Sequence, residues 1–417
     1  MRHDQIAYGR EQDADVLIVG TGHGGAQTAI ALRHKRFPGT IAMIGAEPEL
    51  PYERPPLTKH YLSGTKSAGE IRIRSEAYWS EQKISLHLGS PVVALDAARR
   101  TVVLQSGQRI GYRNLVWAAG GRARHLTCAG HAAAGVHSIR HRVEVDRLRA
   151  ELSAARRVVI VGAGYIGLEA AATLVKQGKR VAVIEACDRV LARVAGAPLS
   201  TFYEAQHRQH GVDVRVGATV QCVEEHNGHA TGVRLATAEV LPADVVIVGI
   251  GIQPEVEVLA QAGARVANGL VVDEACRTTL PDVFAIGDCA LHPNHFADGR
   301  SVRLESVQNA TDQAVTVAAV LTGQSATYRS VPWFWSEQYD LRLQTVGLSQ
   351  GFDEMVVRGD PAPAGFSVVY LRQGAVIALD CMNATRDFVQ GKTLVLNRSH
   401  ADPHQLADSS VPLKTLA

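Results

Sequence analysis

The sequence predicts an α/β protein with two doubly wound domains. A pattern of β-strand, glycine-rich turn and helix occurs twice, and a later apolar strand ends in a Gly-Asp pair. The chain has 417 residues, which is more than one hydrophobic core usually serves. Apolar residues make up 46% and charged residues 20%, as in ordinary folded proteins.

The first copy of the pattern starts with the aliphatic strand 16–19. The glycine turn Gly20-Thr21-Gly22-His23-Gly24-Gly25 and an alanine-rich helical stretch follow directly. In such a turn Gly20 permits the sharp bend, Gly22 lets the backbone approach a pyrophosphate, and Gly25 allows the helix to pack closely on the strand. The phosphates would then lie at the helix N-terminus, so the segment predicts a Rossmann-like dinucleotide-binding domain.

The second copy combines the strand 158–161 with the turn Gly162-Ala163-Gly164-Tyr165-Ile166-Gly167 and another helix. The next predicted strand ends in Glu185, about 20 residues further on, where a carboxylate accepts a hydrogen bond from a ribose 2′-hydroxyl. Glu185 would repel a 2′-phosphate, so NADH is expected rather than NADPH. A glycine turn without a ligand and a solvated Glu185 are the alternatives, and the repetition of the whole pattern favours two nucleotide sites.

A third signal is the short apolar strand 283–286, followed by Gly287 and Asp288. A carboxylate in that place can accept hydrogen bonds from a polyol such as ribitol. We therefore assign the first site to FAD and the second to NADH. The buried strand 245–248, which ends in a glycine-rich breaker, indicates the return of the chain to the first domain.

Charge and cysteine content exclude several other classes. A net charge of +2 does not fit a general nucleic-acid binder, and no apolar run approaches the roughly 18 residues of a membrane span. Asp4, Glu11, Asp13 and Asp15 argue against a secretory signal, so we expect a cytoplasmic protein without membrane or nucleic-acid partners. The six cysteines contain no Cys-x-x-Cys pair, and neither a metal site nor a disulfide framework is predicted. We expect these thiols to be reduced and buried.

The motifs together resemble the oxygenase-coupled ferredoxin reductases of the putidaredoxin reductase type. Besides the two glycine turns, the narrower motifs that carry this resemblance are Pro51-Tyr52-Glu53-Arg54-Pro55-Pro56-Leu57-Thr58-Lys59, Leu168-Glu169, Ala285-Ile286-Gly287-Asp288 and Pro332-Trp333-Phe334-Trp335-Ser336-Glu337-Gln338-Tyr339. The resemblance implies a discontinuous FAD domain at residues 1–121 and 249–327, an NAD domain at 122–248 and a third, C-terminal α+β domain at 328–417.

Motif matching extends the resemblance to individual contacts. It implies FAD contacts at Gly20, Gly22, Gly24, Gly25, Arg54, Lys59, Val92, Arg140, Asp288 and Val307, and NADH contacts at Gly162, Gly164, Ile166, Gly167 and Glu185. Relatives often carry an acid where this chain has Ala46, so we expect the adenosine ribose contact of the first site at Glu47 instead.

The resemblance also implies the chemistry. A hydride donor delivers two electrons together and an iron–sulfur carrier accepts one at a time, so a flavin must stand between NADH and a [2Fe-2S] ferredoxin. We expect the Lys59 cation beside the flavin to stabilise negative charge, with Glu169 as its partner. Trp335 is expected either at the flavin edge or in the core of the C-terminal domain.

Three alternatives deserve comparison. Thiol-based flavoenzymes need a cysteine after the first domain's second strand, and residues 43–62 contain none. A rubredoxin or another small one-electron acceptor is the closest rival to ferredoxin. A flavoprotein of the apoptosis-inducing-factor type, which acts by interaction, is the rival from another class.

Overall fold

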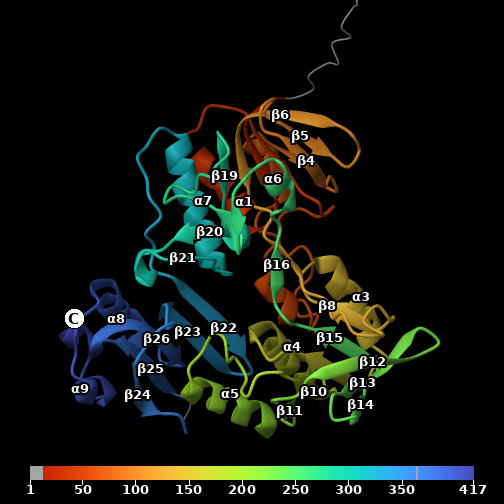
Figure 1. The fold of residues 1–417 in the computed structure, drawn as a ribbon, viewed down its shortest axis with the longest axis vertical. Helices are drawn as coiled ribbons and strands as arrows, with labels where there is room; N and C mark the ends of the chain where they lie inside the picture. Colours follow the sequence, from red (N-terminus) through yellow and green to blue (C-terminus); the bar gives the residue numbers. More distant parts are fainter. Residues whose placement is uncertain (1–12, 363–364) are drawn as a thin grey trace, which may run out of the picture. The chain divides into compact units, whose positions relative to one another are not determined.

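The computed structural model describes residues 13–362 and 365–417, and its contacts divide the chain into two compact units (Figure 1). The first unit holds residues up to Glu53 together with Arg72–Gly121 and Pro254–Ser330, and the second holds Arg54–Ile71, Arg122–Gln253 and Val331–Ala417. Residues 54–71 thus cluster with the second unit, although they fall inside the predicted FAD domain. The finer division into three domains stays a prediction. Asp4 and Glu11 lie outside the described residues.

A parallel sheet forms the centre of the first unit. Its strands lie in the order β3 (Ile84–His87), β2 (Ile41–Ile44), β1 (Ala14–Val19), β6 (Arg109–Trp117) and β19 (Val283–Ala285). The long strand β6 also pairs through its first half with β5 (Thr101–Leu104), which in turn pairs with β4 (Val92–Asp96), both antiparallel. The consecutive apolar residues of β1 are explained by this central position, because a strand covered on both faces needs no polar side.

Both faces of this sheet are covered. Val16 and Ile18 of β1 pack toward the helices α1 (His23–His34) and α7 (Val307–Leu321), which lie against each other (Figure 1). Leu17 and Val19 point into a second core that includes Leu259 of α6 (Glu257–Gln261). The remaining elements of the first unit are α2 (Glu76–Glu81), β17 (Val266–Ala267), β18 (Gly269–Val271), η2 (Gly287–Cys289), β20 (Ala290–Pro293), η3 (His295–Ala297) and β21 (Ser301–Val302).

The second unit contains another parallel sheet, in the order β11 (Asp213–Arg215), β10 (Arg180–Ile184), β9 (Arg157–Val161), β15 (Val245–Val248) and β8 (Val136–Ser138). Its helices are α3 (Arg142–Leu152), α4 (Tyr165–Lys176) and α5 (Ala197–Gln209). An antiparallel sheet of β12 (Val220–His226), β13 (His229–Leu235) and β14 (Val240–Pro242) follows. The chain passes between the units through β7 (Gly121–Ala123) and β16 (Ile252–Pro254), and η1 (Pro55–Thr58) also belongs to the second unit.

The C-terminal part of the second unit is an antiparallel sheet with helices after it. The strands lie in the order β22 (Trp333–Gln338), β23 (Leu341–Gly347), β26 (Ala375–Met382), β25 (Gly365–Arg372) and β24 (Glu354–Asp360). The helices are α8 (Thr385–Asn397), α9 (Pro403–Ala407) and η4 (Leu413–Leu416). These sheets and helices confirm the predicted α/β class with two doubly wound sheets and a C-terminal α+β part. None of the helices within the described ranges is long and apolar enough to cross a membrane.

A buried arginine of this sheet forms hydrogen bonds with the C-terminal residues 406–411. Arg358 is 3% exposed, and its Nε lies 2.9 Å from Oδ2 of Asp387. Its other nitrogens donate to four backbone carbonyl groups of the C-terminal tail, those of Leu406, Asp408, Ser409 and Val411. The tail therefore has a polar anchor as well as its apolar contacts.

Candidate functional site

The first glycine turn has a backbone that only small residues allow. Gly20 adopts φ +111°, and a Cβ there would overlap the carbonyl oxygen of Ala118. A Cβ on Gly25 would overlap the carbonyl oxygen of Gly20. Helix α1 begins directly after Gly22, with neither a side-chain cap nor an acidic residue in its first turn. The strand, turn and helix thus meet as closely as a pyrophosphate-binding turn requires.

The second glycine turn repeats this geometry. Gly162 adopts φ +104°, and Cβ atoms on Gly162 and Gly167 would overlap the carbonyl oxygens of Gly249 and Gly162, respectively. Around Gly164, in contrast, a Cβ would meet no atom of the described residues within 4 Å, apart from the two chain neighbours. Helix α4 starts after Gly164, without a side-chain cap or an acid in its first turn, and Ile166 is 44% exposed there. The turn therefore leaves space at the position where the resemblance expects a nucleotide.

Glu185 lies at the end of β10 and is held by the backbone. Its Oε2 accepts a hydrogen bond of 2.8 Å from the amide of Ala163, and its Oε1 accepts one of 2.9 Å from the amide of Cys187. The carboxylate is thereby fixed beside the second glycine turn. Sequence reasoning missed Arg193, whose guanidinium borders Gly251 and whose charge acts on Cys187, so a cation also lies near this strand end.

The other residues predicted in the first unit sit on several of its elements. Val92 opens β4, Val307 opens α7, and Asp288 lies in η2 directly after the positive-φ residue Gly287. A Cβ on Gly24 would lie 3.3 Å from Cδ1 of Ile286. Glu47 follows β2 and accepts a hydrogen bond from the hydroxyl of Tyr52, a partner that the sequence did not suggest.

Lys59 and Glu169 form a buried ion pair in the second unit. Nζ of Lys59 lies 2.5 Å from Oε2 of Glu169, and the two side chains are 14% and 4% exposed. Lys59 follows the short helix η1, while Glu169 lies on α4, just past the second glycine turn. The pairing that the resemblance implied is thus present in the structure. A buried charge pair needs further hydrogen bonds to offset its desolvation.

Two residues that sequence reasoning missed supply those bonds. Thr58 donates from Oγ1 to Oε2 of Glu169 over 2.6 Å, and Ser336 donates from Oγ to Oε1 over 2.7 Å. Both lie inside the quoted motifs, next to Lys59 and Trp335. Nothing in the spacing of residues 58, 169 and 336 indicates that they meet.

The remaining predicted residues of the second unit are Arg54, Arg140 and Trp335. Arg54 donates from a terminal nitrogen to the carbonyl oxygen of Arg140 over 2.5 Å. Trp335 is partly exposed on β22, and its ring centroid lies 5.5 Å from that of Trp333. The aromatic cluster thus leaves Trp335 partly exposed, and its role stays a prediction.

Comparisons with known proteins match this arrangement along nearly the whole chain. The model of the pyridine nucleotide-disulphide oxidoreductase family matches residues 14–314, and that of the reductase C-terminal domain matches residues 333–417. This chain belongs to the pyridine nucleotide-disulphide oxidoreductase family. The recognised resemblance is therefore confirmed.

Several relatives within the family are similar over most of both chains. A ferredoxin–NAD(P)+ reductase from a Sphingomonas species is 56% identical over 401 residues, which are 96% of this chain and 97% of the relative. Putidaredoxin reductase from Pseudomonas putida is 40% identical, with 96% of each chain covered. The crystal structure of a covalent putidaredoxin reductase–putidaredoxin complex matches with a TM-score of 0.93 at 39% identity, over 98% of both chains.

Membership in this oxidoreductase family settles the class of cofactor. Its members use FAD and NAD(P)H. The residues of this chain fit such groups, because both glycine turns bring backbone rather than side chains to the start of α1 and α4, and a Cβ on Gly164 would meet only open space. The choice between NADH and NADPH, and the individual contact residues, stay predictions.

The cysteines do not form the thiol centre that the family's name suggests. All six are free, and only three of them, Cys276, Cys289 and Cys381, are buried, so the expectation that all are buried was too broad. Burial raises the pKa of Cys289 to about 12 and also raises the pKa of Cys276 and Cys381, which keeps these thiols protonated. The carboxylate of Glu185 likewise raises the pKa of Cys187.

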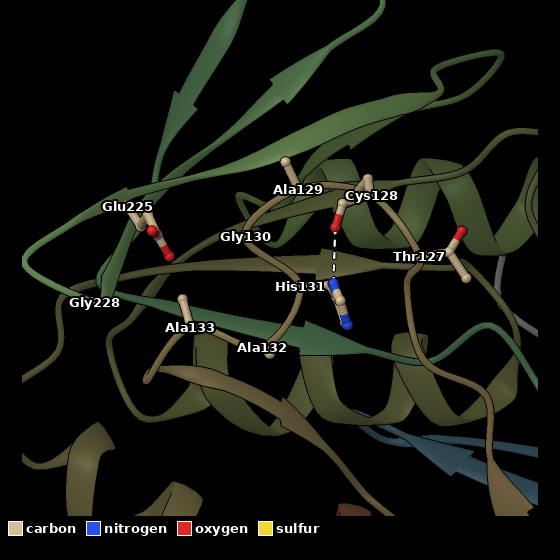
Figure 2. Close-up of a pocket in the computed structure, with 9 residues that line it drawn as sticks. All are labelled: Thr127, Cys128, Ala129, Gly130, His131, Ala132, Ala133, Glu225 and Gly228. Atoms are coloured by element: carbon tan, nitrogen blue, oxygen red, sulfur yellow. Dashed lines mark hydrogen bonds between the residues drawn. The ribbon is translucent and has the colours of Figure 1, made fainter.

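A pocket of about 480 Å³ lies elsewhere in the second unit, between the loop 127–133 and the turn from β12 to β13 (Figure 2). Its titratable side chains are Cys128, His131 and Glu225, and Nδ1 of His131 contacts the carbonyl oxygen of Cys128 at 2.9 Å. None of the predicted site residues lines it. We therefore treat this pocket as separate from the candidate site.

Proposed function

We propose that the chain is an NADH-dependent flavoprotein reductase that passes electrons singly to a [2Fe-2S] ferredoxin serving an oxygenase. The observation that carries this proposal is the joint presence of two nucleotide-type glycine turns and the buried Lys59–Glu169 pair. Relatives support the ferredoxin, because a ferredoxin–NAD(P)+ reductase is 56% identical and the putidaredoxin reductase of the covalent complex has the same fold.

Bound FAD supplies the chemistry, since a flavin takes two electrons as a hydride and returns them one at a time. Lys59 contributes a positive charge that offsets the negative charge of the reduced cofactor. Oε2 of Glu169 lies 2.5 Å from Nζ of Lys59. Glu169 is on the first turns of α4, and we propose that the nicotinamide half of the second nucleotide binds beside it. Trp335 is proposed at the side of the flavin that faces the carrier.

Glu185 supports NADH as the preferred donor. Two backbone amides hold its carboxylate in place at the end of β10, where it can accept the ribose 2′-hydroxyl. A 2′-phosphate would meet this fixed negative charge at short range. Arg193 offers a compensating cation nearby, so the expected preference is for NADH with NADPH accepted less well.

A rubredoxin is the second candidate acceptor. A rubredoxin–NAD+ reductase from Pseudomonas putida is 36% identical over 368 residues, against 56% for the ferredoxin–NAD(P)+ reductase. The higher identity over a longer alignment favours ferredoxin. We also propose the cytoplasm as the location, because six free thiols suit a reducing compartment.

An anaerobic titration tests the proposal. About one equivalent of NADH per bound flavin should bleach the yellow holoprotein, and a [2Fe-2S] ferredoxin should then restore the colour as it is reduced. Bleaching without reduction of ferredoxin would overturn the acceptor, and reduction of rubredoxin alone would replace it. Slow NADH oxidation with a dye acceptor would favour the interaction protein of the apoptosis-inducing-factor type.

A matched pair of variants tests the role of Lys59. Lys59→Gln removes the buried cation, while Lys392→Gln removes an exposed one from α8 of the same unit. We expect the first to slow bleaching by NADH at least tenfold and the second to leave the rate unchanged. Equal rates in the two variants would contradict the role of Lys59.

A further inference from the structure

The strand β22 carries two kinds of residue on its two sides. Trp333 and Trp335 are partly exposed, whereas Ser336 and Gln338 are 0% and 1% exposed. Alternation along a strand explains why Ser336 and Gln338 share a face. Within this motif, the proposed function uses Trp335, and Ser336 donates to Glu169, but Gln338 has no role assigned so far.

These polar residues belong to a continuous chain of hydrogen bonds that begins at Glu169. Ser336 contacts Oε1 of Glu169 at 2.7 Å, and Nε2 of Gln338 contacts Oγ of Ser336 at 3.2 Å. Oε1 of Gln338 lies 2.8 Å from Nε2 of His207, and Nδ1 of His207 lies 2.9 Å from the hydroxyl of Tyr339. The chain thus joins residues of α4, β22 and α5 with Tyr339, which follows β22.

The charge of Glu169 fixes the direction of every one of these bonds. A carboxylate only accepts, so Ser336 must donate to it, and the Ser336 oxygen is left to accept from the amide nitrogen of Gln338. The amide oxygen of Gln338 therefore faces His207, which must donate from Nε2.

The remaining nitrogen of His207 then accepts from the hydroxyl of Tyr339. Burial lowers the pKa of His207 to about 4, so the ring carries a single proton at neutral pH, as this direction requires.

Tyr339, the last member of this chain of hydrogen bonds, is held in place by residues near the protein surface. The ring of exposed His210 stacks on Tyr339, with centroids 3.7 Å apart and an interplanar angle of 12°. Nζ of Lys176 donates to the carbonyl oxygen of Tyr339 over 2.9 Å. Tyr339 itself has φ +59°, a strained conformation for a tyrosine, which these contacts hold in place.

We propose that Ser336, Gln338, His207 and Tyr339 are positioning residues for Glu169, because together they present its Oε2 to Lys59 through a one-directional chain of hydrogen bonds. The importance of the chain for turnover rests on the proposed function of the Lys59–Glu169 pair. In this proposal the four residues of this chain of hydrogen bonds contact neither the electron donor nor the electron acceptor. Thr58 donates a hydrogen bond to the second oxygen of the same carboxylate, Oε2 of Glu169.

Nuclear magnetic resonance tests the direction without any turnover. In holoprotein labelled with ¹⁵N-histidine, the His207 signals, assigned by their loss in His207→Gln, should show a neutral ring protonated on Nε2 from pH 6 to pH 8. In Gln338→Leu the Nε2 proton of His207 loses its acceptor, and both neutral tautomers of the ring, protonated on Nε2 or on Nδ1, should become populated. A ring protonated on Nδ1 in the wild type would overturn the proposal.

A double-mutant cycle tests the link to Glu169. Ser336→Ala and Gln338→Leu should each slow the bleaching by saturating NADH about tenfold, because each cuts the chain that ends on the charged carboxylate. The double variant should be no slower than either single variant, since the residues act as one unit. Ser367→Ala is the matched control, because Ser367 is equally buried and donates to Asp387 outside the chain.

The outcomes separate this inference from the proposed function. If the two substitutions slow the reaction independently, to about a hundredfold in the double variant, or if Ser336→Ala behaves like Ser367→Ala, the positioning role is wrong. If NADH does not bleach the wild type at all, the proposed function fails. The nuclear magnetic resonance experiment on His207 then still tests the direction of the hydrogen bonds.

Discussion

The two glycine turns share a backbone and differ in what surrounds it. In both, the first glycine has a positive φ and the last one packs against the carbonyl oxygen of the first. The carboxylates that follow the next strands are held differently, because Glu185 accepts from two backbone amides whereas Glu47 accepts from the hydroxyl of Tyr52. We therefore propose that the repeated turn provides the phosphate site and that the strand ends set which nucleotide each site prefers.

The largest effect is expected where the two turns are alike. Gly25→Ala and Gly167→Ala each place a methyl group on a backbone carbonyl oxygen, which neither helix nor strand can avoid without moving. Each should lower the free energy of unfolding by about 3 kcal/mol or more, as measured by urea denaturation. The control is Gly69→Ala, where the atom nearest to a Cβ is Oγ of Ser67, 3.9 Å away. Equal losses in all three variants would contradict this explanation.

The second unit also buries a carboxyl group, Asp380, whose Oδ2 accepts a 2.6 Å hydrogen bond from Tyr370. Desolvation raises the pKa of Asp380 from 3.8 to about 7. The folded state therefore binds a proton that the unfolded state has lost, and this group's contribution to stability falls as the pH rises from about 4 to about 7.

Asp380→Asn should remove that pH dependence. Relative to the wild type, the variant should gain on the order of 3 kcal/mol between pH 4 and pH 7 and nothing further above pH 8, in urea denaturation at each pH. A difference between the two proteins that does not change with pH would show that Asp380 ionises normally.

A substitution at Gly164 separates what the fold requires of the second glycine turn from what NADH binding requires of it. Gly164→Ala adds a methyl group where, apart from the two chain neighbours, no atom of residues 13–362 and 365–417 lies within 4 Å, and its φ of −76° suits alanine. The free energy of unfolding should stay within about 0.5 kcal/mol of the wild type. NADH binding should weaken on the order of a hundredfold in a fluorescence titration, because the methyl group occupies the space proposed for the pyrophosphate. Unchanged affinity would place the nucleotide elsewhere.

The smallest of these effects belongs to the strand-end carboxylates. Glu185→Ala should weaken NADH binding about tenfold, with FAD content unchanged, because one charged hydrogen bond to the ribose is lost. It should also narrow the preference for NADH over NADPH. Glu47→Gln is the control from the first unit, and it should leave the affinity for NADH within about twofold. An unchanged affinity in Glu185→Ala would mean that the carboxylate serves only the local backbone.

The sequence predicts best what is local. The glycine turns depend on residues a few positions apart, and the structure shows the strained backbone that those glycines imply. The surroundings of Glu169 depend on Thr58 and Ser336, which are distant in sequence and meet only through the packing of η1, α4 and β22. The same is true of Arg358 and the tail carbonyl groups, because no periodicity marks an arginine that will be buried.

The resemblance carried the prediction further than spacing alone. It paired Lys59 with Glu169, and that pair is present at 2.5 Å. Residues 54–71, which the resemblance assigns to the FAD domain, group with the second unit by their contacts, and the boundaries of the three domains stay a prediction. Short connecting segments carry few apolar residues of their own, so their tertiary neighbours cannot be inferred from their composition.

We propose that one chain holds two dinucleotides, of which one reduces the other. The most direct measurement is the stoichiometry of anaerobic bleaching in purified protein of known concentration. We expect one FAD per chain and complete bleaching by about one equivalent of NADH. A protein that binds no flavin after reconstitution, or a bound flavin that NADH leaves fully oxidised, would contradict it.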